Sequence, residues 1–182
     1  LDGSSMTAFH RDGEVGVCSR NLQLKTDEVN QGNSFVRMLF DSCLNVALPL
    51  LSDRFGNVAV QGELIGEGIQ GNQEKILGHR FYLFDVFLID ESRYATPAER
   101  KEIFQMLLAH GVNPTLVNHV PILFENISLP ELNCSTIEDL LKVAEGPSIN
   151  PAAQREGLVF KRTDGMFSFK AISNKWLVKN SD

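Results

Sequence analysis

The fold class follows from one stretch near the carboxyl end, Gly157-Leu158-Val159-Phe160-Lys161-Arg162-Thr163-Asp164-Gly165-Met166-Phe167-Ser168-Phe169-Lys170-Ala171-Ile172. Two apolar, β-type segments, 157–162 and 166–172, flank the short sequence Thr163-Asp164-Gly165. An Asp-Gly pair between two such segments favours a hairpin, because the turn requires residues that tolerate positive φ. The stretch therefore predicts two antiparallel strands.

Further β-type segments lie upstream of this hairpin. Residues 13–19 alternate around two valines, 57–65 carry apolar residues at every second position, and 80–89 are dense in aromatic and branched side chains. These patterns are typical of strands with one buried face.

Three helices are indicated by their ends and by apolar spacing. Thr96-Pro97-Ala98-Glu99 forms a capping box before a helix that ends at Gly111, Ser135-Thr136-Ile137-Glu138 begins a second helix that ends at Gly146, and 33–48 has the spacing of a third. The expected buried faces are Ile103, Met106, Leu107 and His110; Ile137, Leu140, Leu141 and Ala144; and Phe35, Leu39, Cys43 and Val46. Strands interleaved irregularly with helices indicate an α+β domain.

Composition restricts the class of protein. The chain has 182 residues, of which 43% are hydrophobic, and it shows no repeats or linkers, so we expect one domain over 1–182. A net charge of −6 argues against a surface that coats nucleic acid generally, although a local basic groove is compatible with it. Three widely spaced cysteines form neither a disulfide framework nor a zinc site. Without a signal peptide or an apolar run of roughly 20 residues, we expect a cytoplasmic protein with no membrane partner.

Five segments combine polar residues with strand patterns in a way that a hydrophobic core does not require. They are Leu1-Asp2-Gly3-Ser4-Ser5, Cys18-Ser19-Arg20-Asn21, Gln61-Gly62-Glu63-Leu64-Ile65-Gly66-Glu67-Gly68, Arg155-Glu156-Gly157-Leu158-Val159-Phe160-Lys161, and Phe169-Lys170 with Lys175 and Lys179 beyond. A carboxylate inside a strand is costly to bury unless a cation, a metal ion or a hydroxyl group meets it. Two such strands, with lysines on others, would suit a site for Mg²⁺ and a polyphosphate.

Taken singly, each segment has a plainer interpretation. Glu63 alone suits a solvated strand edge, Arg20 a surface position, and Lys161 with its neighbour a solvated face. Only the order and spacing of the whole set point to one site.

In order and spacing, the set resembles the collinear motifs of the covalent nucleotidyltransferase superfamily, which comprises ATP-dependent RNA ligases, DNA ligases and mRNA capping enzymes. It is most similar to the RNA ligases, whose first motif reads Lys-x-Asp-Gly-x-x and is matched after its lysine by Leu1-Asp2-Gly3-Ser4-Ser5. The other matching segments are Ser19-Arg20-Asn21, Gly62-Glu63-Leu64-Ile65-Gly66, Phe81-Tyr82-Leu83-Phe84-Asp85-Val86, Glu156-Gly157-Leu158-Val159-Phe160-Lys161 and Phe169-Lys170. The resemblance spans residues 1–179.

The resemblance implies an α+β nucleotidyltransferase domain of the ATP-grasp-like ligase type, with antiparallel sheets flanked by helices and a nucleotide groove between the sheets. In that family, a lysine attacks the α-phosphate of ATP and forms a lysyl-adenylate. AMP then passes to a 5′-phosphate end, and a 3′-hydroxyl attacks to seal the strand. The implied cofactors are ATP, which becomes the AMP adduct, and Mg²⁺ or Mn²⁺. The implied partners are RNA ends or a nicked duplex that contains RNA.

The same resemblance implies roles for residues around the nucleoside. Glu63 would accept a hydrogen bond from a ribose hydroxyl, and Arg20 would contact the ribose or the nucleic-acid end. Phe84 would stack on adenine, with Tyr82, two positions earlier on the same strand face, as the next candidate.

Around the phosphates, the implied catalytic residues are Glu156, Lys161 and Lys170. Glu156 would bind or orient the metal ion near the nucleophile, while Lys161 and Lys170 would hold the α-phosphate. Asp2 and Gly3 would shape the nucleotide pocket beside the nucleophile.

The chain departs from the family pattern in two places. The nucleophilic lysine is expected immediately before Leu1, so we expect a fragment whose upstream sequence includes that lysine, either truncated or chemically modified, and an accessory domain. In the fifth motif some relatives show Lys-x-Lys, whereas this chain has Lys170-Ala171-Ile172, so that Lys175 or Lys179 would have to supply the second cation.

Two alternatives to an active RNA ligase stay open from the sequence. One is a non-catalytic module that binds nucleotide or RNA. The other is a DNA ligase or a capping-type nucleotidyltransferase, although those enzymes usually continue into an OB-fold domain after the fifth motif. A locally basic end, with six Lys or Arg and three Asp or Glu over 155–182, agrees with a nucleic-acid partner.

Overall fold

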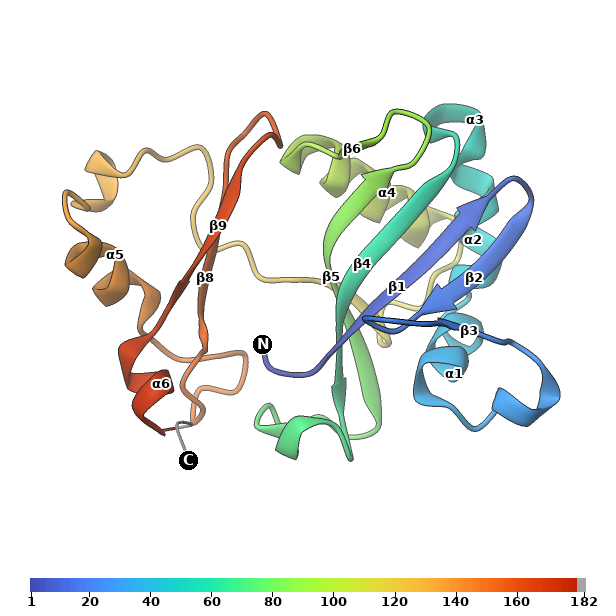
Figure 1. Cartoon of the computed structure of the whole chain (residues 1–182), viewed down its shortest axis with the longest axis horizontal. Helices are drawn as coiled ribbons and strands as arrows, with labels where there is room; N and C mark the ends of the chain where they lie inside the picture. The colour runs from blue at the N-terminus through green and yellow to red at the C-terminus, as the bar shows by residue number, and fades with distance from the viewer. Residues whose placement is uncertain (180–182) are drawn as a thin grey trace.

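A seven-stranded sheet and a separate two-stranded hairpin make up the β-structure of the computed structural model, which describes residues 1–179 (Figure 1). The large sheet has the strand order β3-β2-β1-β4-β5-β6, and β7 pairs with β5. Its strands are β1 (Ser4–Arg11), β2 (Glu14–Cys18), β3 (Gln23–Leu24), β4 (Val58–Gly66), β5 (His79–Leu88), β6 (Arg93–Tyr94) and β7 (Val117–His119). All neighbours are antiparallel except β5 and β7, which are parallel.

The hairpin consists of β8 (Gly157–Lys161) and β9 (Ser168–Ile172), which confirms the antiparallel pairing predicted from the Asp-Gly turn. Phe160 and Phe169 lie opposite each other and stack with ring centroids 4.9 Å apart. Predicted strands over 13–19, 57–65 and 80–89 are also confirmed as β2, β4 and β5. The sequence prediction missed β1, although Met6, Ala8 and His10 alternate inward along it.

Helices surround these sheets in the order of the chain. They are α1 (Ser34–Asp41), α2 (Leu44–Ala47), α3 (Ser52–Phe55), α4 (Pro97–Ala109), α5 (Ile137–Ala144) and α6 (Asn174–Lys179). Short 3₁₀ turns are η1 (Glu28–Asn30), η2 (Leu48–Leu51), η3 (Gln70–Asn72) and η4 (Pro130–Leu132). The α+β class is therefore confirmed, with helices on one face of the large sheet and beside the hairpin (Figure 1).

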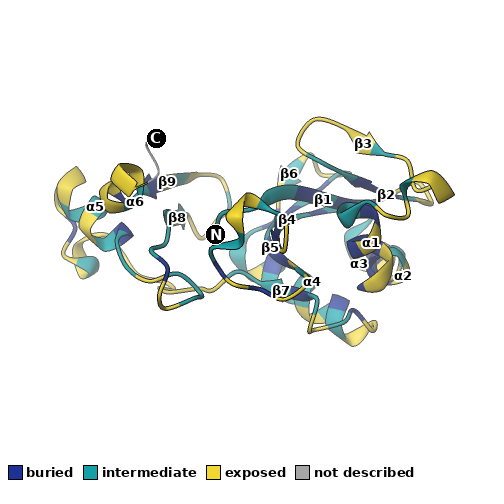
Figure 2. Ribbon diagram, turned by 90° about the horizontal axis from the view of Figure 1, so that it is seen from below, coloured by how far each residue is buried: buried dark blue, intermediate teal, exposed yellow. Residues whose placement is uncertain are grey.

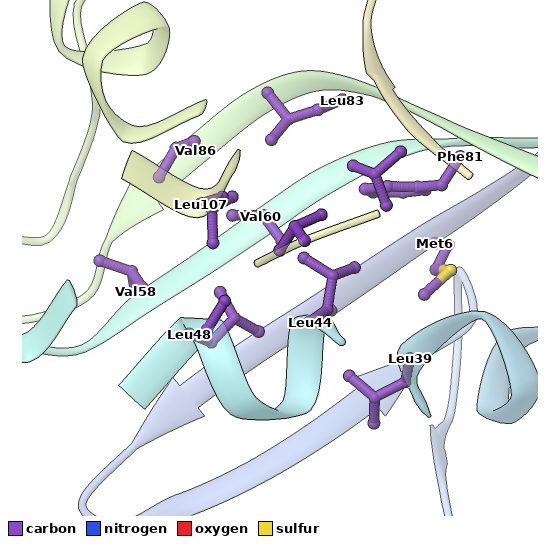
Figure 3. Close-up of a cluster of buried hydrophobic side chains, with 14 of the residues drawn as sticks. Met6, Leu39, Leu44, Leu48, Val58, Val60, Phe81, Leu83, Val86 and Leu107 are labelled. Atoms are coloured by element: carbon purple, nitrogen blue, oxygen red, sulfur yellow. The ribbon is translucent and has the colours of Figure 1, made fainter. Parts of the chain in front are cut away.

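The main hydrophobic core lies between the large sheet and helices α1, α2 and α4 (Figure 3). Its labelled members come from the strands and from the helices that cover them: Met6, Leu39, Leu44, Leu48, Val58, Val60, Phe81, Leu83, Val86 and Leu107. Burying one such side chain stabilises the fold by roughly 1.5–3 kcal/mol. In Figure 2 the buried residues concentrate in this part of the molecule, and the hairpin side is more exposed.

The predicted single helix over 33–48 is wrong. The chain breaks after α1, where Cys43 adopts a left-handed backbone with φ of 64°, and α2 begins at Leu44. The break rotates the helical face, so that Cys43 and Val46 are exposed, whereas Leu44 and Leu48 are fully buried.

Two other predicted faces are only partly correct. In α4, Ile103 and Leu107 are fully buried as predicted, but His110 is exposed because the helix has already ended at Ala109. In α5, Ala144 is buried and Leu140 and Leu141 are half-buried, whereas Ile137, at the first turn, is 71% exposed.

No single helix within residues 1–179 is long and apolar enough to cross a membrane. The pair Ser34–Asp41 and Leu44–Phe55 would pass by length and composition only, and it is bent by 60°.

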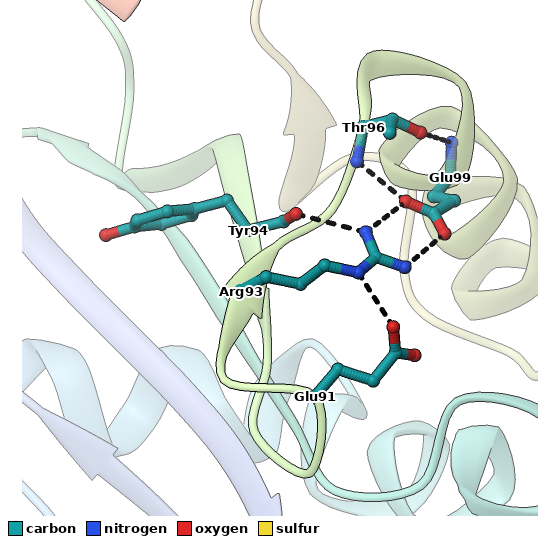
Figure 4. Close-up of polar contacts among 5 residues, drawn as sticks. All are labelled: Glu91, Arg93, Tyr94, Thr96 and Glu99. Carbon is teal, nitrogen blue, oxygen red and sulfur yellow. Dashed lines mark hydrogen bonds and ion pairs between the residues drawn. The ribbon is translucent and has the colours of Figure 1, made fainter. Parts of the chain in front are cut away.

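A charged network holds the start of α4 (Figure 4). Thr96 accepts a hydrogen bond from the Glu99 amide at 3.2 Å, and Glu99 accepts one from the Thr96 amide at 2.7 Å. Arg93 donates to both oxygens of Glu99, at 2.7 and 2.8 Å, to Glu91 at 2.7 Å, and to the Tyr94 carbonyl at 3.2 Å. These hydrogen bonds from Arg93, more than any other contact, lower the pKa of Glu99 to about 2.

The network predicts a specific pH dependence of stability. Because the pKa of Glu99 is lower in the folded than in the unfolded chain, its ionised form stabilises the fold above about pH 4.5, and this contribution is lost as the pH falls toward 2. We expect Glu99→Gln to lower the free energy of unfolding at pH 7 by about 1 kcal/mol, with a smaller difference at pH 3. Urea denaturation at stepped pH measures this, with Glu91→Gln as the matched control. A constant difference between pH 7 and pH 3 would contradict the assignment.

Candidate active site

The candidate site lies on the face of the large sheet that turns away from α1, α2 and α4. Along β4, Val60, Gly62 and Leu64 are buried on the core side, whereas Gln61 and Glu63 alternate to the opposite face. The hairpin β8–β9 lies across from this face in Figure 1. Polar side chains of the sheet and of the hairpin therefore approach one another.

A hydrogen bond fastens the amino-terminal segment to β4. The Gly3 amide donates to Glu63 Oε1 at 3.0 Å. A Cβ at Gly3 would lie 2.4 Å from the Leu64 carbonyl oxygen, so only glycine permits this close approach. The backbone directly after Asp2 is thereby held against β4.

Four charged side chains meet at this point: Asp2, Glu63, Glu156 and Lys170. Lys170 Nζ lies 2.5 Å from Glu156 Oε1, which joins β9 to the residue before β8. Burial raises the pKa of Asp2, and the charge of Glu156 adds to the effect, while Lys170 opposes it. The same two residues act on Glu63, whose pKa burial also raises. The structure thus brings together residues that are more than 150 positions apart in the sequence.

Lys161 lies apart from this group. Lys161 and Lys170 share one face of the hairpin, since Val159 pairs with Lys170 and alternation places Lys161 on the same side. However, Lys161 Nζ lies 2.5 Å from Asp85 Oδ2 on β5, and not beside Glu156. The sequence analysis expects Lys161 and Lys170 to bind the same phosphate. In the present arrangement the two amino groups have different partners, so this shared role stays a prediction.

The two aromatic candidates on β5 differ in availability. Tyr82 is 6% exposed and packs in a small second cluster with Ile65 and Ile76. Phe84 is half-buried and lies at a β-bulge, where both Phe84 and Asp85 oppose Gln61. Phe84 is therefore more accessible than Tyr82 to a ligand that binds between the sheet and the hairpin.

Arg20 lies in the turn after β2 and is exposed. The register that pairs Thr7 with Cys18 and Ser5 with Glu63 places this turn at the same end of the sheet as the charged group. Of the two lysines considered for the missing second cation, Lys175 binds Glu145 at 2.7 Å, and Lys179 is exposed on α6.

Carboxylates of the site fit a metal ion that is also bound by phosphate oxygens of a substrate. Within residues 1–179, no group of three or more His, Cys, Asp or Glu side chains is arranged to hold a metal by itself. Mg²⁺ and Mn²⁺ are commonly held by one or two carboxylates together with substrate phosphates and water. Asp2 and Glu156, which lie close enough for the charge of Glu156 to raise the pKa of Asp2, provide such carboxylates.

Sequence reasoning missed the buried partners of Asp85. Arg100 on α4 is 5% exposed, and its Nη1 lies 3.9 Å from Asp85 Oδ1, while its Nε donates to His119 Nε2 at 3.1 Å. Arg100 lies three residues before Ile103, on the same face of the predicted helix, and this spacing could have suggested that Arg100 is buried. Nothing in the sequence indicates its partners.

The burial of Glu63 predicts a cost in stability. Because folding raises the pKa of Glu63, the ionised side chain destabilises the fold above its ordinary pKa of 4.5. This loss of stability is absent at a pH where Glu63 is protonated in both the folded and the unfolded chain. We expect Glu63→Gln, which keeps an oxygen for Gly3, to raise the free energy of unfolding at pH 7 by up to about 1 kcal/mol, and to match the unsubstituted chain near pH 4. Chemical denaturation at both pH values tests this. Lower stability of Glu63→Gln at pH 7 would contradict the stated charge balance.

Comparison with known proteins identifies the family. A family model described as RNA ligase matches residues 1–177. A solved structure of Naegleria gruberi RNA ligase with PPi is 47% identical and superposes with a TM-score of 0.87, covering 100% of this chain and 50% of that chain. A mutant of the same ligase with ATP and Mn gives 46% and 0.87, and another with AMP and Mn gives 44% and 0.86, each with the same coverage.

No curated protein matches the chain significantly. The chain spans about half the length of the Naegleria ligase chains that it matches. Since the family model covers nearly all of the sequence and the similarity to solved RNA ligases extends over its full length, the chain belongs to the RNA ligase family.

Proposed function

We propose that this chain is the adenylyltransferase domain of an ATP-dependent RNA ligase. The observation that carries the proposal is that Glu156 and Lys170, which form an ion pair, lie close to both Asp2 and Glu63 between the hairpin and the sheet. Family membership supports it, as do the ATP, AMP and Mn present in the solved relatives. Strand sealing by the longer protein is part of the same proposal.

The nucleophile would be a lysine directly before Leu1, as the family motif implies. That position is two residues before Asp2, and the amino group of Leu1 lies close enough to lower the pKa values of both Asp2 and Glu63. To attack the α-phosphate it must be deprotonated, and a metal ion bound beside it would favour the neutral amine against the neighbouring carboxylates. Lys170 would bind the α-phosphate oxygens, where negative charge grows in the transition state.

The nucleoside would occupy the groove between β5 and the hairpin. Glu63 has its second carboxylate oxygen available for a ribose hydroxyl, because Gly3 donates to Oε1. Phe84 on the sheet and Val159, which is 56% exposed on the Lys170 side of the hairpin, would contact the two faces of adenine.

The metal ion would be held by Asp2 or Glu156 together with phosphate oxygens. When bound, Mg²⁺ or Mn²⁺ would neutralise phosphate charge and favour departure of pyrophosphate. Glu156 would keep Lys170 in place until the nucleotide arrives, since their ion pair is present without it.

The RNA ends would enter beside the phosphate end of the groove. AMP would pass to a 5′-phosphate, and a 3′-hydroxyl would then displace it. Arg20, exposed at this end of the sheet, is suited to contact a phosphate or ribose of the strand. RNA ends and nicked duplexes are both compatible substrates.

The direct test is covalent labelling. A preparation that includes the residues before Leu1 should form a protein–AMP adduct with radiolabelled ATP and Mg²⁺ or Mn²⁺, and peptide mapping should locate it on the preceding lysine. Reversible ATP binding by the folded protein, with no adduct under any condition, would instead indicate a non-catalytic binding module. Adducts with GTP, or sealing of DNA but not RNA, would indicate a capping or DNA-ligase activity.

The role of Lys170 is tested by a matched pair of lysine variants. We expect Lys170→Met to slow adduct formation by about 100-fold, because a cation at the α-phosphate is lost. Lys142→Met, on helix α5 and in an exposed pair with Asp139, should change the rate by less than about threefold. Equal effects of the two substitutions on the single-turnover rate would refute a specific role for Lys170.

A further inference from the structure

The outer edge of β5 is left uncovered at the β-bulge. β6 pairs with Phe87 and Leu88, and β7 pairs with 81–83, so neither strand pairs with Phe84 or Asp85. Arg100 reaches this gap from α4 and is 5% exposed there.

Arg100 is incompletely bonded at this position. Its Nε donates to His119 Nε2 at 3.1 Å, which leaves the His119 proton on Nδ1, where it is donated to the Val120 carbonyl at 2.7 Å. Nη1, by contrast, is buried without a hydrogen-bond partner and lies 3.9 Å from Asp85 Oδ1. A buried, unpaired guanidinium N–H is costly, so its retention requires an explanation.

Asp85 is shared between two cations. Lys161 contacts Oδ2 at 2.5 Å, whereas Arg100 faces Oδ1 at the longer distance. The cluster of Asp85, Arg100 and Lys161 thus carries one negative and two positive charges, so one cation exceeds what the carboxylate needs. His119 adds no charge, because burial, followed by the charges of Arg100, Lys101 and Lys161, lowers its pKa.

The surroundings leave space for movement. A cavity of about 150 Å³ between the sheet and the hairpin is lined by all three members of the cluster and by Ser168. Lys161 lies on the hairpin face that also carries Val159 and Lys170, and its four-carbon chain can turn along that face.

We propose that Arg100 is a positioning residue for Lys161, which takes over the Asp85 carboxylate when Lys161 turns toward a phosphate of the bound nucleotide. Without Arg100, withdrawal of Lys161 would leave Asp85 half-buried and unpaired, which is strongly unfavourable. With Arg100, a short approach of Nη1 to Oδ1 replaces the lost ion pair. The inference rests on the proposed function, because it assumes a nucleotide in this groove, but it does not require the covalent step.

The test measures how tightly AMP and adenosine, which differ only by one phosphate, bind to the protein that includes the residues before Leu1. We expect Arg100→Met to weaken AMP binding by about tenfold, as for the loss of one charge-assisted hydrogen bond, and to leave adenosine binding within twofold. Arg54→Met is the control. Arg54 lies on α3 and forms an exposed ion pair with Glu102, which is on α4 like Arg100. This control should alter neither affinity.

A second background shows whether Arg100 acts through Asp85. In Asp85→Asn, Lys161 has no carboxylate to leave, so adding Arg100→Met should no longer weaken AMP binding. Equal losses of AMP and adenosine binding, or the same loss of AMP binding in both backgrounds, would show a merely structural role and overturn the proposal. So would AMP binding by Arg100→Met that equals that of the unsubstituted protein.

The outcomes separate this inference from the proposed function. AMP binding with the expected pattern, but no adduct from ATP, would reject the ligase reaction and retain the role of Arg100. Adduct formation with no effect of Arg100→Met would do the reverse. No binding of AMP by the unsubstituted protein would overturn this inference, and the adduct assay would still decide the proposed function.

Discussion

The site depends on one hydrogen bond, from the Gly3 amide to Glu63 Oε1, which holds the amino-terminal segment against the middle of the sheet. Asp2 and Glu63 both lie close enough to Glu156 and Lys170 for these two residues to act on their pKa values. The charge of Glu156 raises the pKa values of both Asp2 and Glu63, and Lys170 opposes the effect at each. The arrangement is therefore electrostatically incomplete, and a divalent cation with a nucleotide phosphate would complete it.

One ion pair joins the hairpin to the sheet, and a second lies on the hairpin side itself. Lys161 binds Asp85 of β5, whereas Lys170 on β9 binds Glu156, the residue directly before β8. Both pairs are held by short side-chain contacts in a part of the molecule that buries few apolar residues. Exchange of these partners is thus possible without disruption of the main core, which lies on the opposite face of the sheet.

Much of this architecture could be predicted from sequence where local signals were strong. The Asp-Gly turn, the capping box of α4 and the period-two strands β2, β4 and β5 are each encoded within about ten residues. The capping box of α5 was predicted one residue too early, since Thr136 and Asp139 form it in place of Ser135 and Glu138. The charged residues of the site were found through their resemblance to ordered motifs, and not through their local pattern. Prediction failed where tertiary contacts decide. The left-handed backbone at Cys43 ends α1 and changes which residues of α2 face the core. At the unpaired edge of β5, Arg100 is buried beside Asp85.

The central claim is that these scattered charges surround one adenosine phosphate. The most direct measurement is a structure of the longer protein, including the residue before Leu1, with AMP and Mn²⁺ bound. The account predicts the ribose within hydrogen-bond distance of Glu63 and the phosphate within hydrogen-bond distance of Lys170, beside the preceding lysine. A nucleotide bound elsewhere, with Glu63 and Lys170 still in their present contacts, would contradict it.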